Sequence, residues 1–588
     1  MIRSYTADFE TTTNEEDCRV WAWGVSEIDN TENTITGTTL DEFMEWCEKH
    51  PDGNPKVYFH NLKFDIQFVL YWLLKHDFKH IIKTSERATK TFQTLISDKG
   101  LYYCIEVIFY RKGKRVNKVT FYDSYKLIPL SVEAIAETFK LPFKKLKIDY
   151  AAHNNLPEGS PISKEEEEYL KHDVKIVATA LEYFLDQGLD RMTIGSNALY
   201  DYKRILTKEK FKMYFPTPEY HRDVKPSYKG GYTNVNKKYA GKNVKEGVVF
   251  DINSLYSWVM KTQLLPWGTP IFFNGEYKED KLYPLYIQMF TCSFELKEGK
   301  LPTIQIKDSM DFRGNEYLTS SDGDEITLCL NSVDYKLFRE HYEVRNITFH
   351  SGWKFKGTRG LFDEYIDKWT EIKIQAKKQK NYGLYLIAKL MLNALYGKFG
   401  TDVRVKSKIP YLDEEADEVK FKNVEMDDKD GVYIPMASFI TSYARLKTIS
   451  SSQKICDNYK NGISKAEWLY SDTDSLHVLL NGEDVETFIN SCGLEISDTT
   501  LGAWKFESKF TKGKFLRSKC YIEMSTEDVN NPDPEYKLKV TVAGMPKECW
   551  DQVTFRNFKP GATYKGKLQP KIVKGGMVLR SVDFTIKM

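Results

Sequence analysis

Apolar and polar residues alternate near the N-terminus in a way that predicts strands ending in acidic residues. Ser4–Glu10 is expected to form a strand, and alternate strand residues point to one face, so Asp8 and Glu10 would share a side. A second strand, Lys56–His60, leads through Asp65 into an apolar stretch typical of a helix. The pattern predicts a unit whose strand ends present carboxylates, although an Asp-x-Glu pair alone is more often a surface strand end.

A helix with a strong start signal follows in the same region. Ser163 and Glu166 form a capping box that opens a helix extending to about Phe184. Tyr169 and Asp173 are four residues apart and therefore lie on one face of this helix. With the strand ends, the helix completes a set of four carboxylates: Asp8, Glu10, Asp65 and Asp173. Such a set predicts a two-metal site for hydrolysis, in which Tyr169 would orient a water molecule.

A second acidic pattern stands in the latter part of the chain. Asp251 ends the apolar run Val248–Phe250, and Asp472 and Asp474 lie two residues apart between apolar stretches. In an extended chain residues i and i+2 share a face, so Asp472 and Asp474 would aim at one point. Like charges this close are costly unless a cation lies between them. The three carboxylates therefore predict a site for two magnesium ions and in-line phosphoryl transfer.

Residues Leu361–Phe399 are rich in helix formers and predict a long helix. Within it Lys389, Asn393 and Tyr396 occupy one face, at i, i+4 and i+7. A lysine, an amide and an aromatic ring on one stripe suit a nucleoside triphosphate, with charge for the phosphates and a flat surface for base and sugar. The alternative is an ordinary amphipathic helix whose Tyr396 packs inward.

Paired glycines stand between the two acidic regions, in the segment Tyr228-Lys229-Gly230-Gly231. Glycine lacks a Cβ and lets the backbone approach another group closely. A lone motif of this kind is most often a simple turn, so both interpretations stay open.

Composition describes a folded, soluble protein of several domains. The chain has 588 residues, of which 41% are hydrophobic and 29% charged. Its apolar runs are too short to cross a bilayer, and no secretion signal is visible at the N-terminus. Nine scattered cysteines without a Cys-x-x-Cys pair argue against zinc sites and disulfides, which fits a reducing cytoplasm.

Net charge is only +2, so bulk charge does not indicate a nucleic-acid partner. Local charge is more informative, because Lys505–Lys519 carries six basic residues against Glu507 alone, and Lys559–Lys574 carries five lysines and no acid. Such runs are either solvated faces or positive grooves that follow a phosphate backbone.

Seven motifs, taken in chain order, resemble those of family B DNA polymerases. The first three are similar to the family's proofreading-exonuclease motifs, and the other four to its polymerase motifs. They are Asp8-Phe9-Glu10-Thr11-Thr12, His60-Asn61-Leu62-Lys63-Phe64-Asp65, Tyr169-Leu170-Lys171-His172-Asp173, Asp251-Ile252-Asn253-Ser254-Leu255-Tyr256, Lys389–Gly397, Tyr470–Ser475 and Lys519-Cys520-Tyr521. Their order and spacing resemble the short protein-primed subgroup, the phi29-type phage polymerases.

The resemblance implies a multidomain protein of α/β and α+β class. An RNase H-like 3′–5′ exonuclease domain would precede a right-hand polymerase domain of palm, fingers and thumb with two insertions. The implied boundaries are 1–190 for the exonuclease, 191–262 and 433–542 for the palm, 263–360 and 401–432 for the insertions, 361–400 for the fingers and 543–588 for the thumb. The insertions would contact a terminal protein and encircle the template, giving processivity and strand displacement.

The same resemblance implies roles for residues of the polymerase half. Asp251 and Asp474 would be the principal metal ligands, with Asp472 in support. Tyr256 would lie under the sugar and exclude a 2′-hydroxyl, and Tyr396 would line the nucleotide pocket. Further implied contacts are Lys373, Lys389 and Asn393 with the nucleotide, Lys519 and Tyr521 with the primer end, Thr441 and Arg445 with template or primer, and Tyr228, Gly230 and Gly231 with a primer passing between the two sites.

In the exonuclease half, Asp8, Glu10, Asp65 and Asp173 would hold metals, assisted by Tyr169 and Lys145. The residues implied to grip the single-stranded 3′ end are Thr11, His60, Asn61, Phe64 and Ser124.

Three positions depart from the family's pattern, and none of them removes a carboxylate. Ser257 stands in place of a proline, Ile66 in place of a glycine, and Tyr385 in place of a phosphate-binding lysine. Lys377, Lys378 or Lys380 could supply the charge that Tyr385 lacks.

The sequence thus predicts a DNA-directed DNA polymerase with 3′–5′ exonuclease activity, which replicates a linear viral genome. Expected cofactors are two Mg²⁺ per active site, replaceable by Mn²⁺, and the substrates are deoxynucleoside triphosphates (dNTPs). The expected partners are template and primer DNA and a terminal protein, for a monomer without membrane association in the host cytoplasm. Two alternatives remain: an exonuclease with a decayed, DNA-clamping polymerase half, and a non-catalytic nucleic-acid-binding scaffold.

Overall fold

An eight-stranded sheet organises the N-terminal unit. The protein was examined as a computed structural model that describes residues 3–216, 219–305, 317–403, 406–426, 433–531 and 533–587. The strand order is β3-β2-β1-β4-β8-β7-β6-β5. The strands are β1 (Ser4–Thr11), β2 (Val20–Glu27), β3 (Thr34–Gly37), β4 (Lys56–Phe59), β5 (Lys79–His80), β6 (Thr91–Ile96), β7 (Tyr102–Lys112) and β8 (Arg115–Asp123). Since β1 pairs antiparallel with β2 and parallel with β4, its C-terminal end adjoins that of β4.

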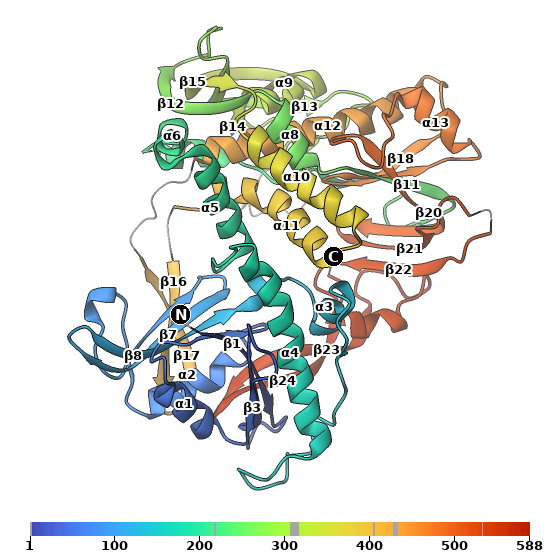
Figure 1. Ribbon diagram of the computed structural model, residues 1–588. Helices are drawn as coiled ribbons and strands as arrows, with labels where there is room; N and C mark the ends of the chain where they lie inside the picture. The colour runs from blue at the N-terminus through green and yellow to red at the C-terminus, as the bar shows by residue number, and fades with distance from the viewer. Residues whose placement is uncertain are drawn as a thin grey trace.

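Four helices accompany this sheet: α1 (Leu40–Lys49), α2 (Ile66–Lys75), α3 (Val132–Thr138) and α4 (Lys164–Asp186). The expected capping box is confirmed, because Ser163 accepts from the backbone of Glu166, whose side chain accepts from the backbone of Ser163. The expected strand β4 and the apolar helix α2 are confirmed as well. Figure 1 shows α4 running past the sheet toward the other half of the molecule.

A second sheet lies at the centre of the other half. Its strand order is β22-β21-β20-β11-β19-β18-β9, and β10 (Asn243–Val244) pairs with β20. These strands are β9 (Thr233–Val235), β11 (Gly247–Ile252), β18 (Glu467–Asp472), β19 (Ser475–Leu479), β20 (Trp504–Arg517), β21 (Cys520–Thr526) and β22 (Lys537–Val542). Helices α8 (Leu255–Thr262), α12 (Ile434–Lys460) and α13 (Val485–Cys492) are part of this half. The apolar core that holds it is continuous with side chains of α3 and α4.

The single long helix expected over Leu361–Phe399 is wrong, because the structure has two helices there, α10 (Asp363–Lys378) and α11 (Tyr382–Phe399). The break has a local cause. Lys380 adopts a left-handed φ of 56°, and the Asn381 side chain accepts a hydrogen bond from the backbone of Leu384, which starts a new helix. The two helices therefore pack against each other beside α5 (Ile194–Leu206) (Figure 1).

A separate four-stranded sheet, ordered β12-β15-β13-β14, lies between α8 and α10 in sequence. It comprises β12 (Leu265–Asn274), β13 (Leu285–Leu296), β14 (Ile326–Asn331) and β15 (Tyr342–Thr358), with α9 (Ser332–His341) between the last two. Short helices α6 (Lys208–Tyr214) and α7 (His221–Val224) precede the second sheet. The chain is thus a mixed α and β protein with several sheets.

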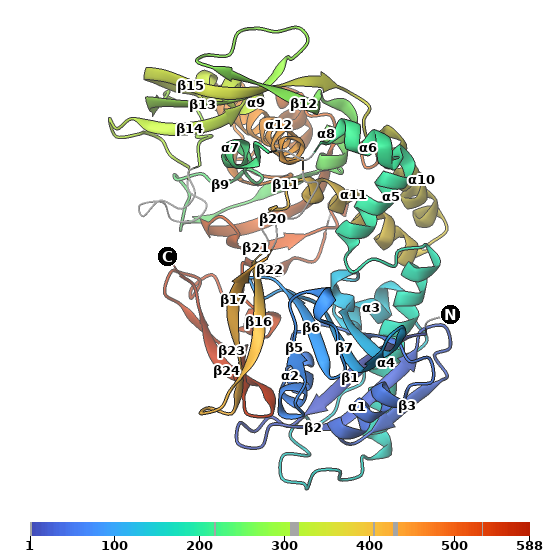
Figure 2. The ribbon, with the colours of Figure 1, turned by 90° about the vertical axis from the view of Figure 1, so that its left-hand side faces the viewer.

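Two hairpins from distant parts of the chain pack on the N-terminal unit. They are β16–β17 (Lys406–Asp413 and Glu418–Glu425) and β23–β24 (Thr563–Val573 and Gly576–Thr585), which lie side by side in Figure 2. Asp417, at the tip of the first hairpin, pairs with Lys75 of α2 at 2.5 Å and with Lys574 of the second hairpin at 3.1 Å. Apolar residues of both hairpins join the core of the N-terminal unit.

All nine cysteines are free thiols. Within the described ranges, no helix is both long and apolar enough to traverse a bilayer.

We expect Gly576→Val to loosen the β23–β24 hairpin. A Cβ at Gly576 would lie 2.4 Å from the Phe68 ring of α2, so a larger side chain must push the hairpin outward. Overpacking of this kind costs about 1–3 kcal/mol. Amide hydrogen exchange within residues 563–585 should become faster, whereas Gly397→Ala, at a position with open space, should leave it unchanged. Unaltered exchange in Gly576→Val would contradict the close packing.

Candidate active sites

The N-terminal unit gathers four carboxylates where strand β1 meets α2 and α4. Asp8 and Glu10 come from β1, Asp65 directly precedes α2, and Asp173 lies on α4. Burial raises the pKa of all four carboxyls. The charge of Asp173 adds to the rise of Asp8, whose pKa reaches about 7, and the charge of Asp8 raises the pKa of Glu10 and Asp65. The expected set is therefore brought close enough for its members to repel one another.

Lys145 and Tyr169 accompany these carboxylates. Lys145 Nζ lies 2.5 Å from Asp173 Oδ2 and 5.3 Å from the centre of the Tyr169 ring. Burial lowers the pKa of Lys145, but Asp173 and Asp8 raise it further, so the amine stays charged. Burial, Glu10 and Asp173 raise the pKa of Tyr169, which keeps its hydroxyl protonated, 3.2 Å from that of Tyr150. Tyr169 is thus a hydrogen-bond donor beside the acidic cluster.

The five residues expected to grip a single strand fall into two groups. Asn61 is exposed, with a left-handed φ of 75°, and Thr11 and Phe64 are half-buried. Ser124 is fully buried and donates to the carbonyl of Phe59, while its oxygen lies 2.9 Å from Nδ1 of His60. Ser124 therefore helps to orient the His60 ring, and the expected contacts of these residues with a single strand stay predictions.

In the second sheet, a tight turn carries Asp474. The expectation that Asp472 and Asp474 share one extended strand is wrong, since β18 ends at Asp472 and β19 begins at Ser475, which pair with each other. Thr473 has a φ of 60°, and the Asp474 amide donates to the Asp472 carbonyl at 2.7 Å, which is a γ-turn. The two carboxylates are therefore presented differently.

Asp474 is directed toward Asp251, whereas Asp472 is bound elsewhere. Burial, then Asp474 and Glu507, raise the pKa of Asp251 to about 7. Burial, then Asp472 and Glu507, also raise that of Asp474. The Asp472 carboxylate instead accepts from Lys519 Nζ at 2.6 Å and from the Tyr470 hydroxyl at 3.1 Å.

Glu507 is a member of this cluster that the sequence analysis did not assign. Val249 pairs with Ser508 and Phe250 with Phe506, so Glu507 is the extra residue of a β-bulge in β20. Bulges often redirect a side chain beside an active site. The signal available in the sequence was that Glu507 is the only acid of the basic segment Lys505–Lys519.

The expected nucleotide stripe on α11 faces outward near these carboxylates. Lys389 and Asn393 are exposed, and the ring of Tyr396 stacks on that of Tyr256, with centroids 3.9 Å apart and planes at 23°. The charge of Lys389 opposes the rise in the pKa of Asp251, so the two groups interact. The Tyr396 side chain is thus partly buried by Tyr256. It does not point fully into the core, as it would in an ordinary amphipathic helix, and it is not free in solvent.

Lysines gather around this stripe. Lys373 Nζ lies 3.4 Å from Ser254 Oγ, and burial, followed by the charges of Lys389, Lys377 and Lys505, lowers the pKa of Lys373. Lys377, one of the lysines expected to compensate for Tyr385, thus adds positive charge near Lys373.

The remaining expected contacts surround the turn that carries Asp474. A Cβ on Gly231 would lie 2.5 Å from Thr473 Oγ1, which explains the absence of a side chain there, whereas a Cβ on Gly230 would meet no atom within 4 Å. The Tyr228 ring lies against Gly400. Tyr521 is buried and stacks on Phe515, with ring centres 4.8 Å apart.

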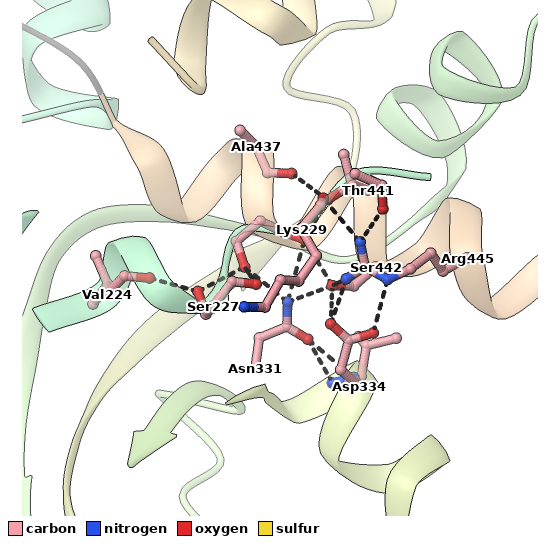
Figure 3. A network of polar contacts seen from close by, with 12 residues as sticks. Val224, Ser227, Lys229, Asn331, Asp334, Ala437, Thr441, Ser442 and Arg445 are labelled. Atoms are coloured by element: carbon pink, nitrogen blue, oxygen red, sulfur yellow. Dashed lines mark hydrogen bonds and ion pairs between the residues drawn. The ribbon is translucent and has the colours of Figure 1, made fainter. Parts of the chain in front are cut away.

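Thr441 and Arg445 are buried inside the protein. Thr441 is 1% exposed and donates to backbone carbonyls of its own helix, while Arg445 is 4% exposed and binds Asp334 of α9 (Figure 3). Both residues use their donors within the protein, and their expected contacts with template or primer stay predictions.

Both clusters consist of oxygen donors. Among the residues that the structure describes, no three His, Cys, Asp or Glu side chains are arranged as a complete metal-binding group. The chemistry of the donors nevertheless suits a hard cation, because all are carboxylate oxygens. Oδ1 of Asp173 is also buried and accepts no hydrogen bond from any described group, so it is available to a ligand.

Comparisons with known proteins agree over the whole chain. A family model described as DNA polymerase type B, organellar and viral, matches residues 49–159 and 155–478. The chain is 43% identical to the DNA polymerase of Bacillus phage phi29 over 596 residues, which cover all of this chain and 99% of that one. It is 33% identical to the DNA polymerase of Streptococcus phage Cp-1 over 613 residues, covering 100% and 99% respectively.

Solved structures give the same result. The fold is similar to that of the phi29 DNA polymerase complexed with primer-template DNA and incoming nucleotide substrates, with a TM-score of 0.91 at 42% identity and complete coverage of both chains. It is also similar to the phi29 DNA polymerase complexed with single-stranded DNA, with a TM-score of 0.90 at 41% identity and the same coverage.

We expect Asp8→Asn to stabilise the protein at alkaline pH in the presence of a chelator. Because folding raises the pKa of Asp8 from 3.8 to about 7, the folded chain holds more protons than the unfolded chain between these values, and stability falls as the pH rises through them. The substitution removes this loss, so the free energy of unfolding should rise by on the order of 2 kcal/mol at pH 8 and by little at pH 4. Denaturant titrations would measure it, with the exposed Glu158→Gln as control. An equal effect at both pH values would contradict the repulsion described above.

Proposed function

The chain belongs to the organellar and viral type B DNA polymerases and is a DNA polymerase of the phi29 type, and we propose that it joins synthesis to 3′–5′ proofreading in one polypeptide. The observation that carries this proposal is the presence of two separate acidic clusters, each with its own lysine. One comprises Asp8, Glu10, Asp65 and Asp173 with Lys145, and the other Asp251, Asp474 and Glu507 with Lys389.

The proposed division of labour follows the units of the fold. Residues 1–190, with the first sheet, would form the exonuclease, and 191–262 with 433–542, which contain the second sheet, the palm. The α10–α11 pair would form the fingers over 361–400, and 543–588 the thumb. The sheet within 263–360 and the hairpin within 401–432 would be the two insertions. Parts of both insertions lie outside the described residues, namely 306–316, 404–405 and 427–432.

In the proposed synthesis, the primer 3′-hydroxyl attacks the α-phosphate of the incoming dNTP and pyrophosphate leaves. Lys389, Lys373 and Lys377 would hold the phosphates, because their charges meet beside the carboxylates. The stacked rings of Tyr256 and Tyr396 would form the floor of the sugar and base.

Asp251 and Asp474 would hold the metal ions of this site, with Asp472 in support. Mg²⁺ bound there, or Mn²⁺ in its place, supplies Lewis-acid stabilisation of the charge that develops on the phosphoryl oxygens. In the structure the Lys519 amine forms an ion pair with Asp472. In the proposed reaction the same amine would steady the primer end.

In the proposed proofreading, the N-terminal cluster hydrolyses the last phosphodiester of a frayed primer. Asp8, Glu10, Asp65 and Asp173 would hold its metal ions. Tyr169 keeps its proton and would orient the attacking water, while Lys145 fixes the Asp173 carboxylate. His60, Asn61, Phe64 and Thr11 would line the path of the single strand.

We further propose protein-primed, processive and strand-displacing replication of a linear viral genome by a monomer in the host cytoplasm. The support is the similarity to phage polymerases and the packing of both hairpins, which come from distant parts of the chain, on the N-terminal unit. Primer-template DNA and a terminal protein would be the partners. The relatives' solved complexes hold primer-template DNA or single-stranded DNA.

One gel tests both activities together. Purified protein is incubated with a labelled primer on a single-stranded template and Mg²⁺, with and without the four dNTPs. Extension with dNTPs and shortening without them are expected. Shortening in both lanes would instead support the exonuclease with a decayed polymerase half, and no change in either lane would support a non-catalytic binder.

Asp474→Asn should abolish extension while the trimming of single-stranded DNA continues at the normal rate. The substitution removes a charge that acts on Asp251 but leaves the N-terminal unit untouched. Primer extension and single-strand degradation, measured on one preparation, check both halves. Retained extension would refute the assignment of Asp474 as a principal ligand.

The double substitution Asp8→Ala and Asp65→Ala should have the opposite effect. Degradation should fall to background because two of the four clustered carboxylates are gone, whereas extension should persist. If the double variant still trims single strands, the nuclease lies elsewhere in the chain.

A further inference from the structure

A buried ion pair joins the separate four-stranded sheet to helix α12. Asp334 lies in the first turn of α9, and its Oδ2 contacts Nη2 of Arg445, while its Oδ1 accepts from Arg445 Nε at 3.4 Å. Ser442 Oγ completes the arrangement, donating to Asp334 Oδ2 at 2.7 Å and accepting from Arg445 Nη2 at 2.7 Å (Figure 3). The two charged side chains are 4% and 12% exposed, so the pair is shielded from solvent.

The remaining arm of the same guanidinium holds the paired-glycine segment. Arg445 Nη1 donates to the carbonyls of Lys229 at 2.9 Å and Gly230 at 2.6 Å. A Cβ on Gly230 would meet no atom within 4 Å, so at this residue the hydrogen bonds to Arg445 hold the backbone where packing does not. Arginine suits this position because its planar fork can serve a carboxylate and two carbonyls at once.

The glycine segment in turn supports the turn that carries Asp474. Gly231 lies against Thr473, and the Thr473 amide donates to the Tyr232 carbonyl at 2.6 Å. Thr448, three residues after Arg445 on α12, donates to the Thr473 carbonyl at 2.6 Å. The turn is therefore held by α12 directly and, through Arg445, by the glycine segment.

We propose that Asp334 and Arg445 are positioning residues for synthesis, which hold Lys229–Gly231 against Thr473 so that Asp474 keeps its place beside Asp251. This inference rests on the proposed polymerase site. It assigns Arg445 an indirect role in place of a contact with DNA, and it makes the four-stranded sheet, through Asp334, part of the support of the active site.

Arg445→Lys separates positioning from mere stability. A lysine can still pair with Asp334, but it cannot also bond the carbonyls of Lys229 and Gly230 in the fork geometry. We expect kcat for single-nucleotide extension to fall by roughly 100-fold, the loss that a ~1 Å misplacement can cause. The Tm, the KM for dNTP and the Kd for primer-template DNA should stay near the wild-type values.

Asp334→Asn tests the other end of the same support. Its kcat should fall by a similar factor, and the double variant Asp334→Asn, Arg445→Lys should be no slower than the slower single variant, because both act through one arrangement. If Arg445 were a DNA ligand, Arg445→Lys would instead weaken DNA binding, and Asp334→Asn would free the guanidinium and tighten it. If the losses in kcat of the two single variants multiplied in the double variant, the proposal would likewise be overturned.

A matched control exists within the same sheet. Asp280 pairs with Lys354 at 2.7 Å, away from the glycine segment, so Asp280→Asn removes an ion pair without touching the support. It should leave kcat unchanged. Degradation of single-stranded DNA by the N-terminal unit serves as the folding control for every variant. A normal kcat in Arg445→Lys would refute the inference. Failure of the wild type to extend a primer would refute the proposed function instead.

Discussion

Repulsion between buried carboxylates is the constraint around which this molecule is built. The acids of each cluster lie close together, and burial and mutual charge raise the pKa of their carboxyls, to about 7 for Asp8 and for Asp251. Each cluster therefore has a lysine within reach, Lys145 beside Asp173 and Lys389 near Asp251, while Lys519 pairs with the neighbouring Asp472. These amines balance part of the charge and leave the other carboxylates available for cations.

Holding like charges together also demands a rigid backbone. In the second sheet the short turn at Thr473 and Asp474 is bonded on all sides, to Tyr232, to Thr448 and to Ile252, whose amide donates to the Asp474 carbonyl at 2.8 Å. A bulge in β20 turns Glu507 toward the same point. The repulsion is therefore opposed by hydrogen bonds from three elements distant in sequence, and rearrangement of the turn would require breaking several of them together.

The same dependence on distant segments holds for the whole chain. The apolar core of the N-terminal unit includes Val419 of one hairpin and Val573 and Val578 of the other. Asp417 binds lysines of two further elements, which links both hairpins to α2. The N-terminal unit is thus closed by parts of the chain that are distant in sequence, since Asp417 is 342 residues from Lys75 and Arg580 is 565 residues from Glu15.

The sequence alone determined the features that depend on local order. The capping box at Ser163, the strands that carry Asp8 and Asp251, the apolar helix α2 and the motif series all follow from short-range pattern. Only the tertiary structure decided where long-range contacts overrule that pattern. The γ-turn at Thr473 exists because β18 and β19 pair around it, Glu507 joins the site because β20 bulges against β11, and Arg445 is buried because α9 brings Asp334 to it. In each case a hydrogen bond or charge from a remote segment sets the direction of the side chain, and no periodicity along the chain records such a partner.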